Sequence, residues 1–328
     1  MSQPTSGPSQ GSLATVGALG DRKKRRIDEL AQAGSLSSEE GISLWRSAWQ
    51  RLRRDPVFLI GLAIVAVFVV VALTSQWITP HDPAARLLID QRSPSNPIPG
   101  PQPGFPLGAD DAGRDMLSRL IAGSRQTLIV GVVATLLGLS GGLFLGTLAG
   151  GIGGWVDAGV MRIVDVLLSI PSLLMAFSIA AMFSKPSQWT VIAAIGIIQI
   201  PIFARLLRGS MMAQRHSDHV LAARALGVRR PAIVFRHMLP NSLGPVIVQA
   251  TLVLAVAIID AAALSFLGLG NPDDTLPEWG QMLGRAQVYF NTHPEVAVYP
   301  AICIIIVALG FTLMGESLRE ALDPKSRR

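Results

Sequence analysis

Six long apolar runs constrain the fold of this 328-residue chain more than any other feature. Each run is close to or above the ~20 residues that an α-helix needs to cross the hydrocarbon core of a bilayer. Half of the residues are hydrophobic and 15% are charged, whereas soluble domains carry about 25% charged residues. The sequence therefore predicts an all-α, polytopic membrane protein. The six predicted transmembrane helices are residues 57–78, 127–150, 160–183, 190–207, 243–269 and 296–318.

Lysine and arginine residues are distributed unevenly between the two sides of these helices. If the N-terminus lies inside, 21 of the 28 basic residues fall on the inside and the other seven fall outside. Cytoplasmic segments of membrane proteins carry the excess of Lys and Arg, so we predict that both termini are cytoplasmic. Basic residues that flank apolar runs also account for the net charge of +6. The charge therefore indicates a lipid bilayer, and not a nucleic acid, as the partner.

The polar segments divide the chain further. Residues 43–55 place apolar and basic side chains largely on different faces, which is typical of a helix lying in the membrane interface. Residues 80–126 are rich in proline, which excludes regular helix or central strand through their middle. We expect a disordered basic cytoplasmic extension at 1–42, an interfacial helix and the first transmembrane helix at 43–79, an extracytoplasmic segment at 80–126, a permease core at 127–323 and a basic cytoplasmic tail at 324–328.

A cytoplasmic loop between the fourth and fifth predicted helices, residues 208–241, has a helix–glycine–helix pattern. Residues 217–226 can form a short amphipathic helix, and Gly227 supplies a stop at its C-terminus. Pro231 suits the first turn of a second short helix, and Pro240 is predicted to end that helix before the next span. The pattern predicts a rigid peg and not a flexible tether.

The loop resembles the EAA loop of ABC importer permeases, which has two alanines, a glycine four residues later and a downstream Leu-Pro. In that family the loop forms a coupling helix that docks in a cleft of the ATPase subunit, and the small side chains of Ala222 and Ala223 suit such a fit. Leu221 stands in the position of the family's glutamate. We therefore do not assign the role of the glutamate carboxylate to this position. The resemblance assigns ATPase coupling to His219, Val220, Leu221, Ala222, Ala223, Arg224, Gly227, His237, Leu239 and Pro240.

Further stretches are similar to the C-type permease of dipeptide, oligopeptide and nickel importers. They include Pro106-Leu107-Gly108-Ala109-Asp110, Gly153-Gly154-Trp155-Val156-Asp157 and Leu264-Ser265-Phe266-Leu267-Gly268. The resemblance implies a multi-pass protein of the bacterial inner membrane that works with a second permease subunit in a heterodimer, two ATPase subunits and an extracytoplasmic solute-binding protein. ATP and Mg would bind to the ATPase subunits, so this chain would hold no cofactor. Dipeptide, oligopeptide, nickel chelate, glutathione and haem all stay open as the solute.

Three polar residues near the predicted spans have two interpretations. Asp165, Asp260 and Ser265 either line the solute pathway or make packing contacts, and Asp165 is spaced to pair with Arg162 on one helix face. Ala261 stands where relatives often carry an acid. A secondary transporter or channel is the alternative class, but one intramembrane acid does not make a proton relay. A membrane enzyme is disfavoured because neither a metal-binding histidine spacing nor a phosphate-binding loop is found.

Overall fold

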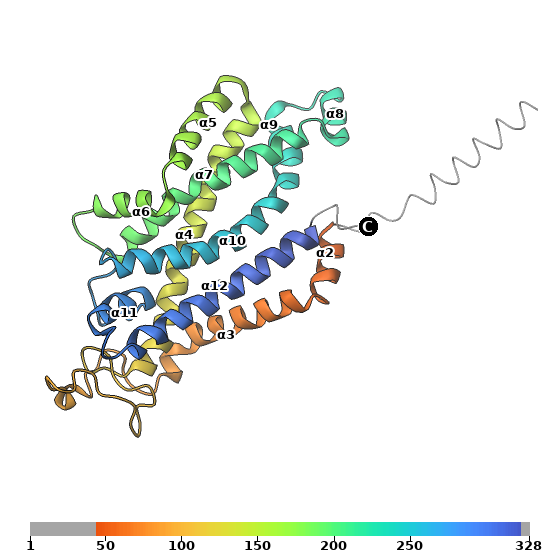
Figure 1. Cartoon of the computed structure of the whole chain (residues 1–328). Helices are drawn as coiled ribbons and strands as arrows, with labels where there is room; N and C mark the ends of the chain where they lie inside the picture. The colour runs from red at the N-terminus through yellow and green to blue at the C-terminus, as the bar shows by residue number, and fades with distance from the viewer. Residues whose placement is uncertain (1–43, 323–328) are drawn as a thin grey trace, which may run out of the picture. The chain divides into compact units, whose positions relative to one another are not determined.

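The computed structural model describes residues 44–322, and within this range it is helical with no strand beyond isolated bridges (Figure 1). The predicted extension at 1–42 and the tail at 324–328 lie outside the described residues. The helices are α2 (Leu44–Leu52), α3 (Pro56–Ile78), α4 (Met116–Ile152), α5 (Gly154–Ser169), α6 (Ser172–Ala181), α7 (Gln188–Gln214), α8 (Asp218–Ala225), α9 (Arg230–Ile233), α10 (Leu239–Phe266), α11 (Trp279–Ala286) and α12 (Glu295–Leu322), with short 3₁₀ turns at Ile89–Gln91 and Gln287–Tyr289.

The all-α, polytopic prediction is confirmed. Within the described residues, five helices are long and apolar enough to cross a membrane, and α5 with α6 forms a bent pair that brings the number to six if the pair is one span. Four of the five spanning helices are α3, α4, α7 and α12, and the fifth runs from Arg230 to Phe266. α2 covers most of the segment that the sequence predicts to be interfacial.

The third predicted helix, residues 160–183, is wrong as a single straight helix. The chain bends by 94° between α5 and α6, because Ile170 leaves the helical conformation with φ −88° and ψ 133°. Pro171 follows directly, and a proline ring disfavours the α conformation in the residue before it. The chain is apolar on both sides of the break, which is why hydropathy alone misses it.

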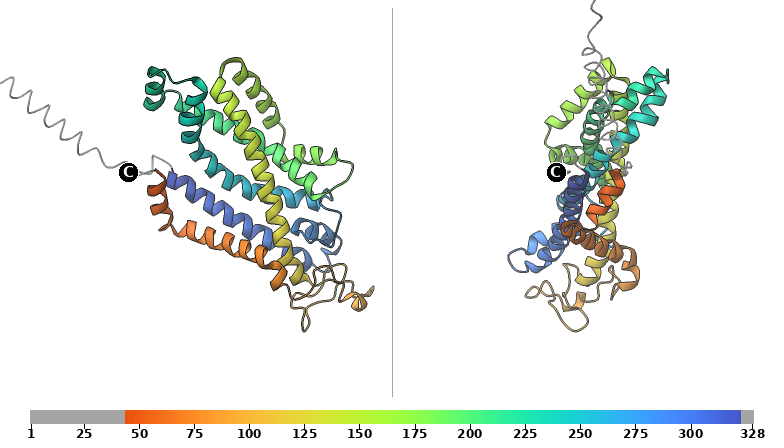
Figure 2. Two further views of the ribbon diagram at one scale, coloured as in Figure 1. Left: turned by 180° about the vertical axis from the view of Figure 1, so that it is seen from behind. Right: turned by 90° about the vertical axis from the view of Figure 1, so that its right-hand side faces the viewer.

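Two ends of the helix bundle carry different structures. α12 packs between α3 and α10, α10 packs against α7, and α4 packs along α7 (Figures 1 and 2). The segment 79–115 lies at one end of these helices, and α8 lies at the opposite end (Figure 1). Following the predicted orientation, we call these the outer end and the inner end. The placement of the proline-rich segment and the coupling loop at opposite ends agrees with the predicted topology.

Glycines on α4 allow α7 to approach closely. A Cβ atom at Gly138 would lie 2.6 Å from Cβ of Gln199, and one at Gly146 would lie 2.9 Å from the carbonyl oxygen of Ala204. Small residues let membrane helices pack at short distance. Close packing against α7 therefore explains the four-residue glycine spacing of α4, which comprises Gly138, Gly142, Gly146 and Gly150.

Helix α4 begins at Met116, well before the start at residue 127 that hydropathy predicts. The Asp115 side chain caps the helix by accepting hydrogen bonds from the backbone N–H groups of Leu117 at 3.3 Å and Ser118 at 3.2 Å. An aspartate at this position satisfies donors that have no partner within the helix. The last part of the predicted proline-rich segment is therefore the polar first turns of a membrane helix.

A network of buried ion pairs holds the outer end together. Asp110 Oδ2 lies 2.7 Å from Arg114 Nε and 3.1 Å from Arg119 Nε, and all three side chains are buried. Asp274 Oδ2 joins the network at 3.2 Å from Arg114 Nη1 and 2.9 Å from Arg285 Nη2. Burial raises the pKa of Asp274, but Arg114 and Arg285 outweigh it and hold that pKa below its ordinary value. The network thus ties the segment before α4 to the loop before α11.

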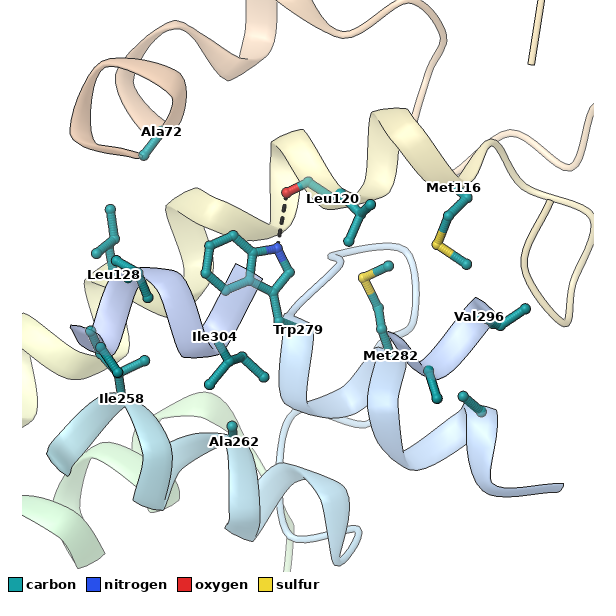
Figure 3. Close-up of a cluster of buried hydrophobic side chains, with 14 of the residues drawn as sticks. Ala72, Met116, Leu120, Leu128, Ile258, Ala262, Trp279, Met282, Val296 and Ile304 are labelled. Atoms are coloured by element: carbon teal, nitrogen blue, oxygen red, sulfur yellow. Dashed lines mark hydrogen bonds between the residues drawn. The ribbon is translucent and has the colours of Figure 1, made fainter. Parts of the chain in front are cut away.

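Apolar packing seals the outer end beneath this network. Trp279 at the start of α11 is buried, and its Nε1 donates to the carbonyl oxygen of Leu120 at 2.9 Å (Figure 3). Its ring also meets Phe68 of α3 edge to face, with ring centroids 5.6 Å apart. α11 is consequently a fixed part of the bundle, because one side chain contacts both α3 and α4.

The orientation can be tested by labelling. In a Cys303→Ser background, a cysteine at exposed Ser95 is expected to react with a membrane-impermeant thiol reagent added outside intact cells. A cysteine at exposed Asp218 is expected to react only after permeabilisation, because the excess of basic residues places the inner end in the cytoplasm. The reverse pattern would overturn the predicted orientation.

Candidate functional site

The predicted helix–glycine–helix loop is present at the inner end. α8 covers Asp218–Ala225, one residue inside each predicted bound, and Gly227 has a φ of +74°. The N–H of Gly227 donates to the carbonyl of Arg224 and the N–H of Val228 donates to that of Ala223, both at 3.0 Å. This pair of bonds is a Schellman motif, which satisfies helix carbonyls and needs a left-handed residue. Gly227 therefore ends α8 as predicted.

One side of α8 packs inward. Val220 and Ala223 are buried, and they form a hydrophobic cluster with Ile233 and Met238 from the second half of the loop. The same cluster includes α7 and α10 side chains, among them Phe203, Leu207, Met211, Val246 and Val253. The loop thus packs against side chains from both spans that flank it, as a rigid peg requires.

The other side of α8 is uncovered. Ala222 and Arg224 are exposed, Leu221 is 46% exposed and Leu226 is 84% exposed. Phe235, which follows α9, is also exposed. Several exposed apolar side chains on the same part of a protein indicate an interaction surface. We call Leu221, Ala222, Arg224, Leu226 and Phe235 the outward surface of the loop; Leu226 and Phe235 are absent from the residues that the sequence motif assigns to coupling.

Ala222 and Ala223 therefore have different surroundings. The sequence predicts that both small side chains fit a partner's cleft, but Ala223 is 6% exposed and packs within the chain's own cluster. Adjacent helical residues point about 100° apart, because a turn holds 3.6 residues. Only Ala222 of the two is open to a partner, so a large residue at position 223 would disturb the loop itself.

A small polar cluster joins the two halves of the loop. Asn241 Nδ2 donates to the carbonyl oxygen of His237 at 2.7 Å and lies 3.2 Å from His219 Nε2. The rings of His219 and His237 are 6.5 Å apart between centroids. The structure thus brings these two predicted site residues together, where they connect α8 to the start of α10.

Pro240 does not end the second short helix, contrary to the prediction. α9 continues through a π-helical turn at Val234–Met238 into α10, and Leu239 and Pro240 lie in the first turn of α10. The N–H of Leu239 bonds to the carbonyl of Val234, five residues earlier. The helix passes Pro240, which has no N–H to donate, directly after a π turn that widens it locally. The loop is consequently continuous with the span α10.

The three polar residues near the spans lie in separate places. Asp165 on α5 pairs with Arg205 on α7 and not with Arg162. Ser265 is buried near the outer end, where it hydrogen-bonds the buried carboxyl of Glu278. Asp260 is partly exposed on α10 and has no hydrogen-bond or ion-pair partner within residues 44–322. Ser265 thus has a hydrogen-bond partner within this chain, whereas Asp165 and Asp260 are not enclosed by it.

Glu278 is a buried acid that the sequence does not mark as unusual. Its carboxylate accepts hydrogen bonds from the N–H groups of Gly280 at 2.9 Å and Gln281 at 3.0 Å, which caps α11. Burial raises the pKa of Glu278, although these two bonds and one from Ser265 oppose the shift. Its contacts are those of a helix cap, so it stabilises the outer end.

The helical bundle and its inner loop define a class of membrane transport protein. Residues 142–328 match the family of binding-protein-dependent transport system inner membrane components, and residues 43–97 match the N-terminal TM domain of oligopeptide transport permease C. The chain belongs to the first of these families, which confirms the resemblance found in the sequence and makes it a multi-pass permease of the inner membrane.

Curated relatives cover nearly the whole chain. It is 39% identical to the dipeptide transport system permease protein DppC of Alkalihalophilus pseudofirmus, over 87% of this chain and 91% of the relative. It is 37% identical to the glutathione transport system permease protein GsiD of Pectobacterium atrosepticum, over 93% and 99%. A solved structure of the MetNI methionine ABC transporter, in an inward-facing conformation, shares the fold with a TM-score of 0.52 at 20% identity, over 63% of this chain and 98% of that chain.

A substitution at Gly227 tests the geometry of the loop. We expect Gly227→Val to lower the ATPase activity of the assembled transporter several-fold while the chain still inserts, because a β-branched residue is strained at φ +74° by about 1–3 kcal/mol. Gly227→Asn is the matched control: asparagine tolerates this conformation, and no atom lies within 4 Å of the added Cβ. Equal activity of the two variants would contradict the strained-turn explanation.

Proposed function

We propose that this chain is one of two permease subunits of an ATP-driven importer for small peptides, and that its inner loop couples it to the ATPase subunits. The observation that carries the proposal is the outward surface of a rigid loop at the inner end, on a chain of the binding-protein-dependent family. The chain itself acts as a pore subunit and not as an enzyme. ATP and Mg would be bound by the partner ATPases.

The packing of the loop explains how it would transmit motion. The inward side of α8 packs on α7 and α10, and the π turn makes the loop continuous with α10. Packed elements move as units because protein interiors resist deformation. A displacement of α8 by an ATPase subunit would therefore shift α7 and α10 together. Leu221 stands where the family has a glutamate, so the proposed contact between α8 and the ATPase subunit has an apolar side chain in place of an acidic one.

The proposed solute class comes from the relatives. Their names refer to dipeptides, di- and tripeptides and glutathione. Each of these solutes has at least one amide bond, a free ammonium group and at least one free carboxylate. A second permease subunit would supply the other half of the pathway, and an extracytoplasmic binding protein would deliver the solute to the outer end.

Reconstitution tests the proposal. We expect vesicles that contain this chain, its cognate permease partner and the ATPase subunits to take up a radiolabelled dipeptide when ATP and the loaded binding protein are present. Omission of the ATPase subunits is expected to abolish uptake. Flux that continues without ATP would instead support the secondary-transporter alternative. Uptake of haem or a nickel chelate, with none of dipeptide or glutathione, would overturn the solute class.

A further inference from the structure

An open cavity lies where α5, α7 and α10 meet. Its volume is about 590 Å³, and most of its lining is apolar. The polar side chains in it come from α7 and α10. The lining residues are Leu168, Ile202, Arg205, Leu206, Gly209, Ser210, Pro245 and Gln249. An apolar wall with a few placed polar groups is the usual make-up of a small-molecule site.

An ion pair between Arg205 and Asp165 stands at this cavity. The Arg205 side chain is 51% exposed and that of Asp165 is 59% exposed. Such an exposed pair contributes little to stability and can open readily. The neighbouring ion pair, between Arg208 and Asp157, has two hydrogen bonds, at 2.9 and 2.7 Å. Both pairs join α5 to α7, but the side chains of the Arg205 pair are more exposed than those of the Arg208 pair.

The face of α10 that lines the cavity carries polar side chains that disfavour contact with lipid. Gln249 of the cavity and Asp260 are eleven residues apart on α10, or about three helical turns, and so share one face. Asp260 has no partner within the described residues. A lone carboxylate turned toward lipid would cost about 2.5–3.5 kcal/mol, and charged residues in spans nearly always face protein or a watery cavity. This face therefore borders either a partner protein or a polar space, and not the acyl chains.

From these observations we infer that Arg205 and Asp165 form a binding site for a zwitterionic peptide on the solute pathway. This inference rests on the proposed function. The ion pair opens when the solute arrives: the α-carboxylate of the peptide binds Arg205, and its α-ammonium group binds Asp165. Each protein charge exchanges one partner for another of the same sign, so no charge is left unpaired during the exchange. The bound peptide can leave when the protein pair re-forms.

The inference predicts a crossed pattern of uptake. Vesicles hold the full transporter, and the binding protein is saturated with either a free dipeptide, its C-terminal amide or its N-acetyl form. We expect Arg205→Gln to lower uptake of the free and N-acetyl forms about 10-fold, because a charge-assisted hydrogen bond is lost, and to leave amide uptake within about twofold. Asp165→Asn should lower uptake of the free and amide forms and spare the N-acetyl form.

Arg208→Gln is the matched control, since it removes a neighbouring arginine that contacts α5. It is expected to lower uptake of all three forms by one common factor. If Arg205→Gln also lowers all three by one factor, the pair is structural and the inference is wrong. Uptake by the wild-type transporter decides the proposed function separately: if it transports another solute and no peptide form, both the solute class and this site fall.

Discussion

Replacing Leu226 by aspartate is expected to abolish association of the permease with its ATPase subunits. Leu226 is the most exposed leucine of the described residues, at 84%, and it follows directly on α8. A buried apolar anchor at the centre of an interface typically contributes 2 kcal/mol or more, and a carboxylate there would also be desolvated without a partner. The affinity should therefore fall by about 100-fold or more.

Co-purification of the ATPase subunits with the tagged permease measures this effect, together with solute-stimulated ATP hydrolysis. Leu87→Asp is the matched control: the same change at an exposed leucine of the outer end should leave co-purification of the ATPase subunits unchanged. Ala222→Trp should act like Leu226→Asp, because Ala222 belongs to the outward surface. Normal ATPase recovery with Leu226→Asp would show that the partner docks elsewhere.

Loss of Asp110 is expected to destabilise the outer end strongly. Asp110 Oδ2 is shared by Arg114 and Arg119, and both arginines are buried. Asp110→Ala leaves buried Arg119 without its ion-pair partner among the described residues, while Arg114 keeps Asp274. Removal of one partner from a buried pair costs about 3–5 kcal/mol. We expect the melting temperature of the purified chain to fall by about 10 °C.

Asp273→Ala provides the comparison. Asp273 adjoins Asp274 in the same loop, but its side chain is exposed and hydrogen-bonds only Thr275. Its removal should leave the melting temperature unchanged. If Asp110→Ala melts at the wild-type temperature, the outer network contributes nothing to stability, and the packing of Trp279 must hold α11 in place alone.

Local signals in the sequence determine the class of fold and the shape of the loop. An apolar run near 20 residues must be helical in a bilayer, because only internal hydrogen bonds satisfy its backbone there. Gly227 marks the end of α8 because its left-handed conformation disfavours other residues. Pro171 is a local signal too, since it breaks the third predicted span between α5 and α6. Hydropathy averages hide such a break.

The roles of individual side chains depend on tertiary packing. Adjacent alanines at 222 and 223 look equivalent in the motif, yet one is exposed and the other is buried because α8 presents only one side to α7 and α10. Asp165 is spaced for Arg162 but meets Arg205, forty residues later. The partner of Asp165 depends on how α5 packs against α7. The spacing of residues along the sequence does not predict this packing.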